Sequence, residues 1–277
     1  MKRIMANKFF VLFFITIISI GSLNSCTEDG ISINDINLFS TSDDLQLGTQ
    51  LDQEIKSNPN EYPIYNNNQA TQYVQNIMNQ IIQSPEIRYK GTFVYKVTLI
   101  NTETINAFAT PGGYIYVYKG LLKYLDNEAT LAAILAHEVA HAERRHATKR
   151  MTKAYGLQVL LNVVLGQNPS TLESIAANLF SGLTLMYNSR EDEYEADEYS
   201  FKYLRSTIWY PGAGKYFFEK IKDQSNNSDF KELFSTHPLD QKRIDALNKL
   251  IQDAGLAAPT ENNIFSQRYL QFKGTLN

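Results

Sequence analysis

The chain has few of the features that define several large classes of protein. Its 277 residues include one cysteine, Cys26, so no disulfide can form within the chain. The apolar run at residues 9–20 is short, whereas a membrane-spanning helix needs about 20 residues. The 26 basic and 29 acidic side chains form no basic stripe, which argues against a nucleic-acid partner. With 43% hydrophobic and 20% charged residues, the composition is that of a globular protein with a substantial core.

The first 25 residues are typical of a secretory signal peptide, in which a basic start precedes a short apolar run and small residues. A buried N-terminal helix is the alternative. The segment ends in LNSC, which resembles the cleavage box of bacterial lipoproteins. Cys26 is therefore predicted to be the lipidated first residue of the mature chain, rather than a free thiol in an exported protein. Attachment to a membrane would then come from acyl chains rather than from charge.

Hydrophobic periodicity and turn residues predict a mostly helical chain with a short β-rich stretch. Strands are expected within residues 91–100 and 114–118, separated by the turn residues Pro111, Gly112 and Gly113. Helices are expected within residues 40–59, 68–84, 126–151, 155–166, 171–186, 189–204, 210–224 and 239–254. We predict four segments: signal peptide 1–25, tether 26–41, folded domain 42–254 and tail 255–277.

Three of the four histidines stand within residues 137–146, in the sequence HEVAHAERRH. His137 and His141 are four residues apart, so a helix places both imidazoles on one face, one turn apart, where they can share a metal ion. Glu138 lies next to them and can act on a water molecule without being a ligand. The alternative is a solvated helix face. The flanking LAAILA is typical of a buried helix, where such polar groups need partners.

A catalytic zinc usually has three protein ligands, so a third is needed. One class of zinc proteases takes it from the pattern H-x-x-G-x-x-H, which requires glycine at 144 and histidine at 147. Arg144 and Ala147 stand there, so that class is excluded. His146 is five residues after His141 and is expected on the wrong side of a continuous helix. The acidic sequence SREDEYEAD at residues 189–197 is the next candidate.

Three blocks in this order, HEVAHAERRH, SREDEYEAD and STHPLDQKRI, resemble the signatures of the M48 family of zinc metallopeptidases. The resemblance spans roughly residues 42–254. It implies a zincin-like α+β fold that is mostly helical, with a small antiparallel sheet packed on the active-site helix. It also implies one Zn²⁺ per chain, held by His137, His141 and Glu193.

The same resemblance assigns supporting roles around the metal. Asp197, one turn after Glu193, is expected behind a ligand imidazole, whereas Glu191 and Glu195 are expected to face solvent. Arg190 is expected to pair with acids near the site. His146 is expected to have a structural hydrogen-bonding role.

The fourth histidine, His237, stands in STHPLDQKRI. The resemblance places it beside the zinc, with Arg243 steadying the same region. His237 either donates to the oxyanion or occupies the open zinc position, and we expect loss of activity when it is removed. The alternative is a helix cap before Pro238, although histidine is not a preferred cap.

These assignments predict a zinc endopeptidase of the bacterial cell envelope, with Glu138 as general base and extended or misfolded proteins as substrates. Substrate is expected to add as a strand along a segment that resembles the family's substrate side. That segment comprises Asn106, Ala107, Phe108 and Ala109. The competing functions are a chaperone-like client-binding lipoprotein and a latent protease covered by residues 157–186.

Overall fold

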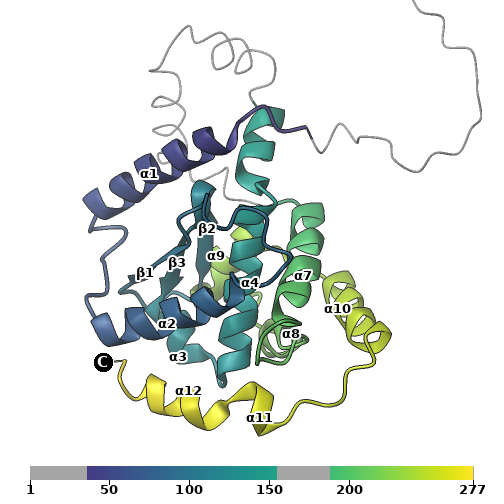
Figure 1. The fold of residues 1–277 in the computed structure, drawn as a ribbon. Coiled ribbons are helices and arrows are strands. Elements are labelled where there is room, and N and C mark those ends of the chain that lie inside the picture. The colour runs from purple at the N-terminus through teal and green to yellow at the C-terminus, as the bar shows by residue number, and fades with distance from the viewer. Residues whose placement is uncertain (1–35, 155–187, 277) are drawn as a thin grey trace, which may run out of the picture. The chain divides into compact units, whose positions relative to one another are not determined.

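A small three-stranded sheet lies at the centre of the structure, a computed structural model that describes residues 36–154 and 188–276 (Figure 1). The strands β1 (Lys96–Ile100), β2 (Ala107–Thr110) and β3 (Tyr114–Tyr118) are arranged in the order β1-β3-β2. β3 pairs antiparallel with β2 and parallel with β1. The α+β, mostly helical class is confirmed. The sheet is mixed rather than wholly antiparallel because β3 inserts between the two earlier strands, a choice that strand periodicity does not encode.

The sequence YIYVY of β3 separates the two layers of the core. Alternate side chains of a strand point to opposite faces, so the three tyrosines face one way and Ile115 and Val117 the other. The tyrosine face packs with Ile55 of α1 (Thr41–Ser57). The opposite face packs with α2 (Asn68–Ile81) and α4 (Glu128–Glu143).

The turn between β2 and β3 depends on glycine. Pro111–Gly113 forms a 3-10 turn in which Gly112 and Gly113 have φ of 76° and 90°, a region that other residues rarely adopt. A Cβ on Gly113 would lie 3.0 Å from the backbone nitrogen of Tyr95. The turn packs against α1, which fixes the direction in which β2 runs toward the histidines.

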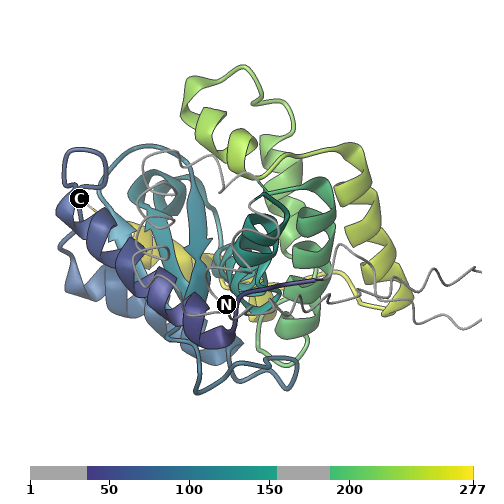
Figure 2. The ribbon, with the colours of Figure 1, turned by 90° about the horizontal axis from the view of Figure 1, so that it is seen from above.

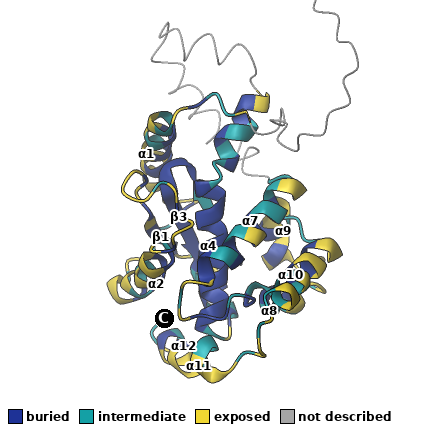
Figure 3. Cartoon of the chain, turned by 45° about the vertical axis from the view of Figure 1, so that its right-hand side comes forward, coloured by how far each residue is buried: buried dark blue, intermediate teal, exposed yellow. Residues whose placement is uncertain are grey.

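α4 is the central helix and lies between the sheet and α7 (Arg190–Leu204), as the view from above shows (Figure 2). The side chain of Asn127 caps its start, and every residue from Glu128 to Glu143 is buried (Figure 3). α7 begins with a capping box between Ser189 and Asp192 and packs on its other side against α10 (Gln241–Asp253). Burial on all sides holds the polar face of α4 away from solvent.

The prediction of one helix over residues 126–151 was wrong. α4 ends at Glu143, Arg144 and Arg145 form a turn, and residues 146–154 are helical again. Arg145 has φ 57°, the left-handed conformation that ends many helices. No glycine or proline marks this break. Arg145 forms an ion pair with Asp44 and donates to the backbone carbonyl of Phe39, contacts from distant residues that local sequence does not reveal.

The remaining elements close the core around α4. The predicted tail, residues 255–277, contains a helix whose Tyr269 and Phe272 are buried. Phe272 stacks on Tyr73 of α2 with ring centroids 3.9 Å apart. These elements are α3 (Lys119–Tyr124), α8 (Gly214–Ile221), η4 (Ser228–Phe230), α9 (Lys231–Thr236), α11 (Glu261–Ile264) and α12 (Ser266–Lys273).

The signal peptide, Cys26 and the helices expected at 155–166 and 171–186 lie outside the described residues. Within the described part, no helix has the length and apolar character needed to cross a membrane.

Candidate metal centre

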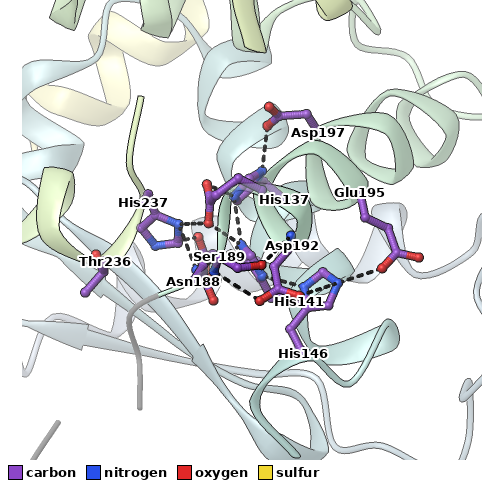
Figure 4. A network of polar contacts seen from close by, with 12 residues as sticks. His137, His141, His146, Asn188, Ser189, Asp192, Glu195, Asp197, Thr236 and His237 are labelled. Carbon is purple, nitrogen blue, oxygen red and sulfur yellow. Dashed lines mark hydrogen bonds and ion pairs between the residues drawn. The ribbon is translucent and has the colours of Figure 1, made fainter. Parts of the chain in front are cut away.

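Four side chains from three helical elements converge on one point between α4 and α7. His137 and His141 come from α4, Glu193 from α7, and His237 from the C-terminal end of α9, and all four are buried. Figure 4 shows how the three histidines lie near one another. One donor atom from each lies within 4.8 Å of the others.

The spacing of the donor atoms matches a metal site. The Nε2 atoms of His137 and His141 are 2.9 Å apart, and they lie 3.3 and 3.2 Å from the carboxylate oxygens of Glu193. Ligands held tetrahedrally at about 2.0–2.2 Å from zinc lie about 3.3–3.6 Å from one another. The three predicted ligands are therefore arranged at the separation that a small divalent cation requires.

Glu193 Oε2 is buried and forms an ion pair with Arg243, whose Nη1 lies 2.6 Å away. A buried carboxylate needs such a partner, and the guanidinium offsets the cost of burying this one. Burial raises the pKa of Glu193, but the charges of Arg243 and the histidines outweigh it and hold the pKa well below its ordinary value. The carboxylate is thus ready to bind a cation.

Asp197 lies behind His137. Its Oδ1 accepts a hydrogen bond from His137 Nδ1 at 2.9 Å, which turns Nε2 toward the cluster. Arg243 holds the same carboxylate with two hydrogen bonds of 2.7 and 2.8 Å. The pKa of Asp197 is lowered because Arg243 and His137 outweigh the effect of burial. Arg243 therefore joins α10 to Glu193 and Asp197 of α7.

The two histidines of α4 have opposite pKa shifts. Burial lowers the pKa of His137, but Glu193 and Asp197 outweigh it and raise the pKa to about 10. Burial lowers the pKa of His141 well below 6.5, and the neighbouring His137 adds to this. The carboxylates of Glu193 and Asp197 thus favour positive charge at this point of the structure.

Glu138 adjoins the cluster without belonging to it. It is 2% exposed, and its Oε1 lies 3.6 Å from His237 Nε2. Burial raises its pKa above the ordinary value, although the neighbouring His237 and His137 oppose the shift. Hollows open on both sides of Glu138, and one of them is lined by apolar side chains including Phe217, Phe218 and Leu247.

His237 faces the cluster through Nδ1, which lies 3.1 Å from Glu193 Oε1. Its Nε2 lies 3.2 Å from the backbone carbonyl of Ala107 on β2. The residue is the C-terminal cap of α9, and the N-terminal cap of α10 is Asp240, so the alternative of a cap for the following helix is wrong.

Arg190, Glu191 and Glu195 are charged residues of α7 that have different surroundings. Arg190 does not join the site: it is exposed, and its Nε lies 3.8 Å from Asp240. Glu191 is exposed as expected. The expectation that Glu195 faces solvent was wrong, because its carboxylate accepts hydrogen bonds from His146 and Arg144.

Asn188 is a site residue that the sequence did not indicate. Its Nδ2 lies 3.3 Å from both His141 Nε2 and His237 Nδ1, and its Oδ1 accepts a hydrogen bond from Arg150. It precedes the cap of α7 and has no periodic or motif signal. Only the position of α7 against α4 makes it a neighbour of the histidines.

The fold and the site together define a class. A helix that carries two histidines and a buried glutamate, packed between a small sheet and a second helix that carries an acidic residue, is the arrangement of a zincin-type metallopeptidase. The chain belongs to peptidase family M48, whose family model matches residues 68–251.

The chain is similar to proteins named beta-barrel assembly-enhancing protease and to proteins named mitochondrial metalloendopeptidase OMA1. The beta-barrel assembly-enhancing protease of Yersinia pestis is 32% identical over 66% of this chain and 39% of its own length. The protein of that name in Escherichia coli K12 is 28% identical over 77% of this chain and 45% of its own length. The mitochondrial metalloendopeptidase OMA1 of Schizosaccharomyces pombe is 30% identical over 70% of this chain and 56% of its own length. The chain thus spans less than two thirds of these relatives.

Proposed function

We propose that the chain is a zinc endopeptidase in which His137, His141 and Glu193 hold the metal and Glu138 is the general base. The observation that carries the proposal is the spacing of 2.9 to 3.3 Å between the imidazole nitrogens and the carboxylate oxygens of three buried side chains, beside a buried glutamate. When bound, a zinc ion lowers the pKa of a water molecule and polarises the peptide carbonyl. His₂Glu is a ligand set that catalytic zinc uses in other peptidases.

The residues of the chain account for the proton transfers. Glu138 accepts a proton from the attacking water and returns it to the leaving amine. Its burial suits this role, because a raised pKa brings a carboxylate closer to the pH at which it works. Asp197 holds the imidazole of His137 in the tautomer that presents Nε2 to the metal.

Substrate is proposed to bind along the free edge of β2. Among the described strands β2 is at the edge of the sheet, and the carbonyl of Asn106 bonds to Tyr118 of β3. Alternate residues of an antiparallel strand point their backbone groups to opposite sides, so Ala107 and Ala109 present theirs outward. An extended peptide would pair with these groups, whereas Asn106 and Phe108 keep the strand attached to the sheet.

The cellular setting is proposed from the sequence and from the names of the relatives. A signal peptide followed by Cys26 supports export and lipid attachment, and two similar proteins are named for beta-barrel assembly. Together these support an envelope protease that acts on misassembled or extended proteins. Binding through backbone groups suits such substrates because it requires an unfolded segment and reads side chains weakly.

The test compares residues 27–277 with a Glu138→Gln variant. We expect about one zinc per chain in both proteins and casein cleavage in the unmodified protein alone, with a loss of roughly 10²–10⁴-fold in the variant. Normal cleavage by Glu138→Gln would remove the glutamate from the mechanism. Zinc binding without any cleavage in either protein would favour a client-binding lipoprotein or a latent protease, and the His237→Ala variant below separates these two.

A latent state is a second candidate, and the position of His237 favours it. With its Nε2–H donated to the Ala107 carbonyl, the Nδ1 lone pair faces the metal ligands. In this position the imidazole would offer the metal a fourth ligand, and it also engages a carbonyl that substrate would need. This arrangement argues against our expectation that His237 acts mainly as an oxyanion donor.

His237→Ala separates the two roles. A blocking role gives faster casein cleavage or cleavage of the protein's own chain, whereas an oxyanion role gives a loss of about 10²–10³-fold in kcat with zinc retained. Zinc content and kcat are measured on the same sample, and Thr236→Ala, at the neighbouring position, is the control.

A further inference from the structure

His141 is the only one of the two ligand histidines whose outer nitrogen does not meet a carboxylate directly. His137 Nδ1 donates to Asp197. His141 Nδ1 instead lies 2.7 Å from Nδ1 of His146, a residue that is 1% exposed. His146 Nε2 in turn lies 2.8 Å from Glu195 Oε2 (Figure 4). We propose that His146 and Glu195 form a relay that holds His141 in its metal-binding tautomer, an inference that rests on the proposed zinc site.

The tautomers of His141 and His146 follow from the requirement that Nε2 of His141 be free to bind the metal. His141 Nε2 faces His137 and Glu193, so a neutral ring must carry its proton on Nδ1. That N–H donates to Nδ1 of His146, which must therefore be an acceptor. The remaining proton of His146 is on Nε2 and is donated to the carboxylate of Glu195. Every nitrogen has one role, and the carboxylate fixes all of them.

The geometry explains why a second imidazole is needed. Residues two apart on a helix face different sides, so Glu195 cannot point at the ligand imidazoles from the position that Glu193 uses. The imidazole of His146 lies between Glu195 and His141 and contacts both. It reaches back to His141 because the chain turns at Arg145, where φ is 57°, instead of continuing as one helix.

The relay is anchored at its outer end. Arg144 Nε donates to Glu195 Oε1 at 2.7 Å, so both carboxylate oxygens are engaged. His146 itself is not among the residues whose donor atoms surround the metal position. Its effect on the metal is therefore through His141, which makes it and Glu195 positioning residues.

The experiment measures zinc affinity by competition with a chelator, together with thermal unfolding of the metal-free protein. His146→Phe keeps a ring but no nitrogen, and we expect zinc affinity to fall about 10–100-fold, the usual cost of losing a partner of a ligand histidine. His146→Asn places Oδ1 where Nδ1 stood, so it still accepts from His141 and should recover most of the affinity. Glu195→Ala should weaken zinc binding in the same range as His146→Phe, whereas the exposed Glu191→Ala should not change it.

The metal-free protein distinguishes positioning from general stability. If the relay positions His141, the substitutions His146→Phe and Glu195→Ala should lower zinc affinity strongly and change the Tm of the metal-free protein only slightly. Equal zinc affinity in the wild type and both variants would overturn the relay. So would affinity losses in His146→Phe and His146→Asn that are equal and follow the Tm of the metal-free protein. A wild type that binds no zinc would instead reject the proposed function, so the two failures are distinguishable.

Discussion

Glu191, Glu193 and Glu195 lie within five residues of α7, yet each has different surroundings. Glu193 is fully buried against two histidines, Glu195 is partly buried against His146, and Glu191 is exposed. A residue turns about 100° from its neighbour on a helix, so alternate positions face different sides. The chemistry of an acidic helix is therefore decided by orientation rather than by composition.

Of the two acidic residues Glu191 and Glu193, only Glu193 should be needed for metal binding. Glu193→Gln replaces an anionic ligand by a neutral amide, so zinc content after dialysis should fall strongly. Glu191→Gln changes the same chemistry at an exposed position and should retain about one zinc per chain. Full zinc occupancy in Glu193→Gln would show that the metal is held by another set of residues.

At the scale of elements, α1 and the β2–β3 turn approach each other closely at Gly48. A Cβ at this position would lie well inside the van der Waals distance of the Pro111 carbonyl oxygen and 3.0 Å from Tyr114 Cδ2. Alanine is preferred over glycine in a helix by about 1 kcal/mol. Overpacking costs about 1–3 kcal/mol and here acts on backbone that cannot rotate away. We therefore expect the steric term to exceed the helix propensity.

Gly48→Ala should accordingly lower the free energy of unfolding, which denaturant titration measures. Gly274→Ala is the control, because a Cβ there would meet Gln271 and Leu270 at ordinary distances of 3.4 and 3.8 Å. A Gly48→Ala protein that is more stable than the wild type would mean that α1 moves away from the turn at little cost.

Glu195 of α7 contacts Arg144 and His146 near the end of α4, and the stability that these contacts contribute should depend on pH. Burial raises the pKa of Glu195, but His146 and Arg144 outweigh it and lower the pKa from 4.5 to about 2. Since the native state favours the ionised form, this stabilisation is complete above pH 4.5 and is lost as the pH falls toward 2. The difference in unfolding free energy between the metal-free wild type and Glu195→Gln should shrink over that range. A difference that stays constant would show that ionisation of Glu195 does not stabilise the fold.

At the scale of the whole molecule, the proposed ligands connect α4 and α7, and His237 brings the end of α9 to the same point. A metal that binds only the native state stabilises it by about 2.7 kcal/mol when its free concentration is 100 times Kd. Removal of zinc by a chelator should therefore lower the Tm, and added zinc should restore it. Glu138→Gln is the suitable protein for this measurement because cleavage of the sample is then prevented. A Tm that does not respond to the chelator would argue against a metal that joins these helices.

The location of the molecule is predicted to depend on Cys26. Cys26→Ser removes the thiol that would carry the lipid, so the protein should appear in a soluble or uncleaved form. Mass spectrometry of the mature N-terminus decides the question. An unmodified Cys26, or cleavage at another residue, would reject lipid attachment.

The sequence by itself determined the class of fold, the active-site helix and its two histidines. These features are local: the spacing of His137 and His141 follows from helix geometry, and the alternation in YIYVY follows from strand geometry. The assignments of Glu193, Asp197 and His237 required more, namely the resemblance of three separated blocks to one family. The structure brings Asp197 to His137 and places Glu193 and His237 in the cluster.

Tertiary structure alone decided the direction of β1, the break after Glu143, and the contacts of Asn188, His146 and Glu195. None of these has a local signal. The break depends on an ion pair between Arg145 and Asp44, about a hundred positions apart in the chain. His146 meets His141 only because that break turns the chain back, and Glu195 meets His146 only because α7 packs against α4. Contacts between distant segments fix these positions, and helical or strand periodicity carries no information about them.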